Sequence, residues 1–264
     1  MKYPKQYPNS FARLAVIGVI GLVSVLPASA LAYHPLATDD TGTQGLAGNQ
    51  LELGYDYAHS KAAGVVDIGR EIPFTYTRGL TDSLDAFVGV ARQTSPGDGW
   101  GNVGVGAKWR FYEDEAAKFS MAVKPEIVLP ISRAKEAAGF GNGRASYGLT
   151  LIATKETDFG ELHFNLAVER SNYADTVTFN ERKNRYRLSV APVWTVADKW
   201  KLALDLGLQT NPDPAEKSRM GYVELGMVYS PSEDLDLSLG ITRDVMDGPV
   251  QSTSASFGLT WRFR

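Results

Sequence analysis

The stretch GNVGVGAKWRF, residues 101–111, alternates two kinds of side chain with a period of two. One set of alternate positions is apolar and holds Val103, Val105, Ala107, Trp109 and Phe111. The positions between them hold glycine, Asn102, Lys108 and Arg110. Because side chains at every second position of a β-strand share a face, this stretch predicts a strand with one apolar and one polar face.

Similar runs, each closed by turn residues, fill the chain from residue 50 to its end. About twelve such runs follow one another, which is within the range of strand numbers in outer-membrane barrels. They form one unbroken pattern, which predicts a single domain. Their alternating apolar positions lie in residues 51–57, 72–76, 84–90, 103–111, 119–129, 147–151, 162–168, 186–194, 202–208, 223–229, 235–241 and 255–263.

The segments between these runs alternate in length. Short turns lie near residues 80–83, 113–116, 157–160, 197–199 and 231–234. Longer polar loops lie near residues 59–67, 95–101, 132–144, 171–184, 211–219 and 244–251. Short periplasmic turns and long external loops are typical of an up-and-down membrane barrel. The sequence therefore predicts an all-β fold, an antiparallel up-and-down transmembrane β-barrel of about 12 strands over residues 50–264, with both chain ends on the periplasmic side.

Charged residues gather on the face opposite the apolar rows. A basic side chain at the midplane of the bilayer costs roughly 2 to 4 kcal/mol on the lipid side, so the charged face is predicted to line the lumen. Two basic residues break the pattern, Arg78 and Arg92, and both fall at strand ends where the interface can solvate them. The candidates for lining the lumen are Lys108, Arg110, Lys124, Glu126, Glu169, Arg185, Arg187, Lys201, Asp205 and Glu224.

Two interpretations of this charged set stay open. As a group, the cations and acids form a constriction that selects solutes by charge. Residue by residue, they are equally well explained as cross-strand ion pairs that fill a narrow lumen. A barrel of about twelve strands lies between the small barrels that side chains fill and the large ones that hold open channels.

Aromatic residues gather near the ends of the predicted strands, as in the two interfacial girdles of a membrane barrel. The residues next to short turns or the carboxyl end are Trp109, Phe111, Phe119, Trp194, Trp200, Tyr229, Trp261 and Phe263. Tyr57, Tyr147 and Tyr186 lie next to the long loops. The alternative is a soluble β-sandwich, whose strands also alternate but whose aromatic residues have no reason to collect at strand ends.

The first 32 residues have the organisation of a cleaved secretory signal peptide. A basic start is followed by an apolar run over residues 14–26 and by small residues, with cleavage expected after Ala32 or after Ala30. A membrane-anchor helix is the weaker alternative, because the run is shorter than the ~20 residues a span needs and Pro27 follows it. The basic residues are Lys2, Lys5 and Arg13.

The composition restricts what the exported chain binds. Removing the three basic residues of the signal changes the net charge from −3 to −6, and an acidic chain is a poor partner for nucleic acid. The chain has no cysteine, so no disulfide framework supports it in the oxidising compartment. We expect neither a cofactor nor a metal, and we expect as partners outer-membrane lipid, a small-molecule solute and the barrel-assembly machinery. The predicted location is the bacterial outer membrane.

The stretch at residues 101–111, the turn at residues 78–82 (RGLTD) and the start of the exported chain resemble a known family of outer-membrane proteins. This is the transporter family named for the MetA pathway of phenol degradation. The amino-terminal motif is the most specific part of the resemblance and holds His34, Thr38, Asp39, Asp40, Thr41, Gly42, Gln44 and Gly45. The resemblance implies a barrel with a transport role, without establishing a phenolic substrate. The chain ends in Phe263-Arg264, whereas in the wider barrel pattern the aromatic residue is terminal.

The amino-terminal motif belongs to a segment, residues 33–49, that precedes the predicted barrel. Asp39 and Asp40 beside His34 suggest a metal site, but these residues lack a diagnostic ligand spacing. We therefore expect the segment to form a turn packed into the periplasmic mouth, as a small plug.

The sequence thus predicts an outer-membrane channel or passive transporter for small solutes, and not an enzyme. Hydrophobic or aromatic compounds are candidate solutes. One alternative is a structural or adhesive barrel that binds a partner through its long loops at residues 132–144 and 171–184. A second is an outer-membrane lipid hydrolase. This is disfavoured because His59 and Ser60 are adjacent on a strand and so face opposite sides.

Overall fold

The computed structural model describes residues 34–62, 65–175, 180–215, 217–245 and 250–264. The predicted signal peptide and both of its expected cleavage sites lie outside the described residues. Within them, no helix is long and apolar enough to cross a membrane.

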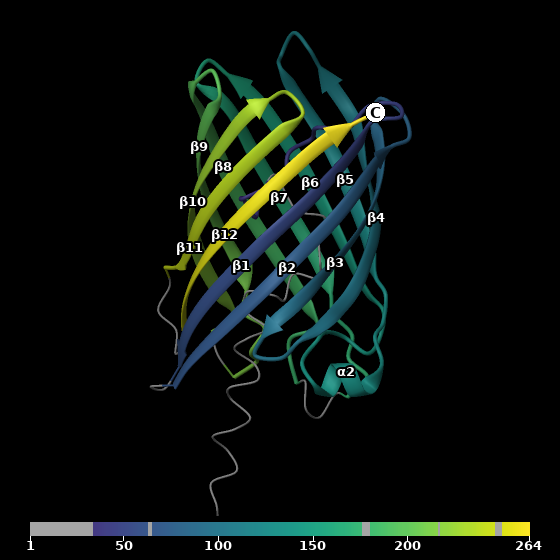
Figure 1. Ribbon diagram of the computed structural model, residues 1–264, viewed down its shortest axis with the longest axis vertical. Helices are drawn as coiled ribbons and strands as arrows, with labels where there is room; N and C mark the ends of the chain where they lie inside the picture. The colour runs from purple at the N-terminus through teal and green to yellow at the C-terminus, as the bar shows by residue number, and fades with distance from the viewer. Residues whose placement is uncertain (1–33, 63–64, 176–179, 216, 246–249) are drawn as a thin grey trace, which may run out of the picture.

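Twelve strands close into a barrel in which every neighbouring pair is antiparallel (Figure 1). Each strand pairs with the next one along the chain, and β1 closes the barrel against β12 in a continuous register from Asn49–Phe263 to Ala62–Val250. The predicted fold class is therefore confirmed. The strands are β1 (Asn49–Ala62), β2 (Val65–Gly79), β3 (Leu84–Ser95), β4 (Gly99–Asp114), β5 (Phe119–Val128), β6 (Ser146–Thr157), β7 (Gly160–Arg170), β8 (Asn184–Ala197), β9 (Trp200–Thr210), β10 (Arg219–Ser232), β11 (Leu235–Asp244) and β12 (Val250–Phe263).

The connections differ at the two ends of the barrel, as the sequence predicts. The carboxyl terminus lies at the end with the short turns, at the top of Figure 1, and the longest described connection, between β5 and β6, carries the short helix α2 (Arg133–Ala137) at the other end. Short turns mark the periplasmic end of a membrane barrel. Two predicted loops are shorter than expected, since β1 and β2 extend over most of residues 59–67 and β3 and β4 over most of residues 95–101.

The two faces of the barrel wall differ as the charge pattern requires. On the outside, Leu166 is 48% exposed and Leu225 is 63% exposed, which fits a surface that lipid covers. On the inside, Asp205 and His163 are fully buried at 0% exposure. The exceptions to the charge pattern lie at the rims, with Arg78 donating to Asn49 Oδ1 at 2.8 Å.

Aromatic side chains pair at the periplasmic end of the outer surface. Ring centroids are 4.5 Å apart for Trp200 and Tyr229 and 4.6 Å apart for Trp261 and Phe263. Such a belt of aromatic rings is characteristic of the membrane interface. The belt therefore fixes the height at which this end of the barrel meets the lipid headgroups.

Candidate functional site: the N-terminal segment inside the lumen

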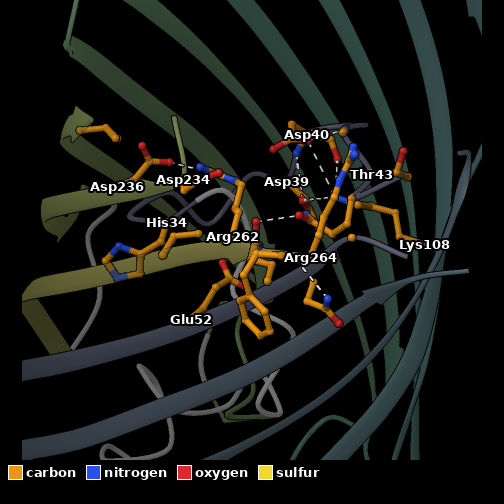
Figure 2. Close-up of a pocket in the computed structure, with 18 residues that line it drawn as sticks. His34, Asp39, Asp40, Thr43, Glu52, Lys108, Asp234, Asp236, Arg262 and Arg264 are labelled. Carbon is orange, nitrogen blue, oxygen red and sulfur yellow. Dashed lines mark hydrogen bonds and ion pairs between the residues drawn. The ribbon is translucent and has the colours of Figure 1, made fainter. Parts of the chain in front are cut away.

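Residues 34–48 lie inside the barrel and contact its inner wall strand after strand, from β11 round to β3. We call these residues the N-terminal segment. Its polar contacts join it to side chains far away in sequence, such as Ser238, Asp205 and Asn165. Figure 2 shows His34, Asp39, Asp40 and Thr43 of this segment beside side chains of the wall.

The segment begins against Ser238 of β11 and Gly258 of β12. His34 Nδ1 lies 2.6 Å from Ser238 Oγ, and a Cβ added to Gly258 would overlap the His34 ring. Burial lowers the pKa of His34 to about 4, so the ring is neutral at pH 7. Leu36 follows and is 3% exposed, packed in a small apolar cluster with Ala191, Val193 and Ala203.

The backbone of the next two residues donates to wall carboxylates. Ala37 N donates to Glu224 Oε2 at 3.2 Å and Thr38 N donates to Asp205 Oδ2 at 2.7 Å. The Thr38 hydroxyl lies 2.8 Å from Asp205 Oδ1 and 2.7 Å from Ser189 Oγ. The segment is thus hydrogen-bonded to β9 and β10 through two backbone amides and one side chain.

Asp39 lies opposite, between the lysines of β4 and β5. Its Oδ2 is 2.6 Å from Lys124 Nζ and its Oδ1 is 3.5 Å from Lys108 Nζ. Asn165 of β7 fixes the Asp39 backbone, accepting from Asp39 N at 2.7 Å and donating to Asp39 O at 2.8 Å. Burial acts to raise the pKa of Asp39, but the two lysines outweigh it, so the pKa lies below its ordinary value and the carboxyl is ionised.

The segment then returns to the periplasmic rim. Thr41 N donates to Thr154 Oγ1 at 3.1 Å, and Gln44 N lies 3.1 Å from both oxygens of Asp85. Gly45 adopts φ +70°, a left-handed conformation that suits glycine, and its carbonyl accepts from Gly48 N at 3.0 Å. This turn leads directly into β1.

A cavity of about 650 Å³ lies on the periplasmic side of the segment. It is bounded by the segment itself, the start of β1, the turn between β10 and β11, and the carboxyl terminus (Figure 2). Its lining is mostly polar and includes Glu52, Lys108, Asp236 and Arg262, of which the last two form an ion pair at 2.6 Å. The volume is in the range of cavities that hold small molecules.

The structure distributes the ten lumen candidates over several levels of the barrel. Lys108, Lys124, Asp205 and Glu224 contact the N-terminal segment. The others are spread along the wall. Arg110 lies 3.3 Å from Glu113 near the periplasmic rim, and Lys201 lies 3.4 Å from Glu161. Glu169 pairs with Arg185 near the external end, Arg187 faces Asp205, and Glu126 is buried.

Every residue of the amino-terminal motif lies in this segment, whereas several wall residues that hold it were not singled out from sequence. Asn165, Ser189, Thr154, Asp85 and Ser238 belong to this second group. All five occupy inward positions of their strands, so alternation alone marks them as lumen residues. Alternation does not tell their height along the barrel, which decides whether they reach the segment.

Two other expectations concern catalysis and metals. His59 is exposed on the outer surface, whereas Ser60 is 4% exposed and faces inward, so the two residues lie on opposite faces as predicted. Across the described residues, no group of three or more His, Cys, Asp or Glu side chains is arranged to hold a metal ion.

Three solved structures with the same fold are an outer-membrane channel and two porins. The outer membrane channel of Pseudomonas putida F1 matches with a TM-score of 0.68 at 12% identity, over 86% of this chain and 100% of that one. The NanC porin matches with a TM-score of 0.55 at 11% identity, over 79% and 98%. The KdgM porin in complex with disordered oligogalacturonate matches with a TM-score of 0.53 at 12% identity, over 80% and 99%. At these identities the likeness establishes the fold, that of an outer-membrane β-barrel.

Comparison with curated proteins gives no match. The model of one family, described as "Putative MetA-pathway of phenol degradation", matches residues 38–263. The match includes most of the amino-terminal motif, beginning at Thr38, and nearly the whole barrel. The chain therefore belongs to this family, as its motifs predict.

Proposed function

We propose that the protein is an outer-membrane channel or passive transporter for small solutes, that the lumen is the solute pathway, and that the N-terminal segment is its plug. One observation carries the proposal. A segment that belongs to no strand lies across a polar lumen, with a solute-sized cavity on its periplasmic side. A polar interior suits a pathway for solutes, and a segment across it can act as the gate.

The contacts that hold the N-terminal segment are noncovalent, so they can break and re-form. They are hydrogen bonds, ion pairs and one small apolar cluster. Each such hydrogen bond contributes roughly 0.5 to 1.5 kcal/mol net, and up to about 3 kcal/mol when one partner is charged. A barrier built this way opens without any change to the barrel wall.

We also propose how the chain is processed and which partners it meets. Residues 1–32 act as a cleaved signal peptide, residues 33–49 as the plug and residues 50–264 as the barrel. The exported chain meets the barrel-assembly machinery and then outer-membrane lipid, and it performs no catalysis. The family description makes hydrophobic and aromatic compounds the first solutes to test.

The proposal is tested by reconstituting the purified protein in planar bilayers and measuring single-channel current. A channel gives discrete conductance steps, whereas complete silence under all voltages and salts contradicts the proposal.

The charge-selecting role of the charged residues that line the lumen is tested with Arg110→Glu, which reverses one charge near the periplasmic mouth. We expect the reversal potential of this variant in a salt gradient to shift toward cation preference. Lys155→Glu is the control, because Lys155 is exposed and is not one of the residues proposed to select charge. Equal potentials for Arg110→Glu and wild type contradict that role.

A further inference from the structure

The contact between Asp39 and two lysines of the wall has the form of an anion-binding site with its ligand in place. Lys124 Nζ and Lys108 Nζ approach different oxygens of one carboxylate, at 2.6 Å and 3.5 Å. The two cations come from neighbouring strands, β5 and β4, and the anion comes from the N-terminal segment. The cations therefore belong to the fixed wall, and the anion belongs to the part that moves in the proposed function.

A second acidic residue of the segment shares this position. Asp40 Oδ1 lies 3.7 Å from Lys108 Nζ, and the same ammonium group lies 3.3 Å from the Asp40 carbonyl. The segment thus brings two carboxylates to the two lysines. If the segment withdraws, both leave together, and buried or partly buried charges that lose their partners are costly.

The cost of withdrawal falls if another anion takes the place of Asp39. We propose that Lys108 and Lys124 form an anion-binding site on the lumen wall, that Asp39 occupies it in the resting state, and that a small monocarboxylate solute displaces Asp39 and so releases the plug. The inference rests on the proposed function and adds the substrate class and the trigger. A ligand that binds only the released state shifts the equilibrium toward that state.

The surroundings of the two lysines favour a monocarboxylate over other anions. Asp85 faces Lys108 from the wall and stays there when the segment leaves, so a second negative charge on the solute is repelled. The ring of Phe87, 6% exposed, lies 5.2 Å from Lys124 Nζ and gives the site an apolar side. An aromatic or aliphatic body attached to a single carboxylate matches both features.

The test compares single-channel current in sodium benzoate and in sodium chloride of equal ionic strength. For the wild-type protein we expect the open fraction to rise about tenfold in benzoate, which lies within the usual range for coupling between two sites. Asp39→Asn removes the resting anion, so this variant is expected to be open in both salts. Asp98→Asn is the matched control, because Asp98 forms an exposed pair with Arg92 at an external turn.

A double variant tests the site itself. Lys108→Gln with Lys124→Gln removes both cations, so benzoate is expected to have no more effect than chloride. The inference is overturned if the double variant still responds to benzoate, if Asp39→Asn stays as closed as wild type, or if succinate and phosphate open the channel as well as benzoate does. Silence of every variant in every salt contradicts the proposed function instead. A heat-dependent shift in gel mobility, checked for each variant, shows that the barrel is folded.

Discussion

At Gly258 of β12, a hydrogen atom in place of a side chain lets His34 reach the barrel wall. We expect Gly258→Ala to weaken the seating of the N-terminal segment by roughly 1 to 3 kcal/mol, the usual cost of overpacking a filled site. The readout is hydrogen exchange at the Thr38 amide, which should become faster by about 5- to 150-fold. Gly148→Ala is the control, because its added Cβ meets only Glu126 Cβ at 3.9 Å. Equal exchange in the two variants contradicts the seating described for His34.

His34 also makes the hold of the segment depend on pH. In the seated segment its pKa is lowered to about 4, from 6.5 in the free chain, so seating requires the neutral ring. The contribution of His34 is fully present above pH 6.5 and is lost as the pH falls from 6.5 toward 4. Asp39 acts in the same direction below its ordinary pKa of 3.8, since its carboxylate form pairs with the lysines.

The pH dependence is measured as the rate at which a protease cleaves the segment between pH 7 and pH 4. Cleavage is expected to accelerate as the pH falls. His34→Gln removes the ring that titrates in this window, so its rate should rise less steeply than the wild-type rate between pH 6.5 and pH 4 after correction for the protease. A wild-type rate that falls with acid, or a variant with the same slope as wild type, contradicts this account.

At the scale of one element, each strand has a lipid face and a lumen face. Leu166 lies near the middle of β7 on the lipid face, where it pairs with Leu151 and Leu188. We expect Leu166→Arg to lower the free energy of unfolding in lipid vesicles by roughly 2 to 4 kcal/mol, and Tyr147→Arg near the interface by about 0 to 1 kcal/mol. Denaturant titration measures both, and equal losses contradict the assigned membrane position.

The strands were predictable because lipid and water impose opposite demands on neighbouring residues. In residues 101–111 apolar side chains that suit lipid alternate with glycine and polar side chains that suit the lumen, and for this reason β4 is predictable from the sequence. The loops were harder, since a strand that extends past the membrane meets water on both faces and loses its alternation. For this reason the sequence predicts a loop where β1 and β2 in fact extend.

The segment inside the lumen was only partly predictable. Its motif marked the residues, and a turn in the periplasmic mouth was the expectation, but the segment extends across the lumen to Ser238 of β11. Its partners Asn165 and Asp205 are 126 and 167 positions away from the residues they hold. Closure of the barrel brings these partners to the same height along the barrel axis as the residues they hold. This height depends on the register of all the strand pairs together.

At the scale of the whole molecule, the protein is a fixed barrel with the N-terminal segment across its lumen, and in the proposed function this segment moves. The fixed part is closed by the pairing of β1 with β12 along their whole length. The N-terminal segment belongs to no strand and is held mainly by side chains of the wall. In the proposed function the passage of solute depends on this one segment, so locking the segment should stop it.

The chain has no cysteine, so a single introduced pair reports on this segment alone. Thr38 Oγ1 and Ser189 Oγ lie 2.7 Å apart, and Thr38→Cys with Ser189→Cys places two thiols in contact between the segment and β8. The decisive measurement is the bilayer current of this double variant before and after reduction of the disulfide. We expect the oxidised protein to be closed and the reduced protein to conduct, because reduction frees the segment from β8. Equal currents in the two states would contradict the claim that the N-terminal segment controls the lumen.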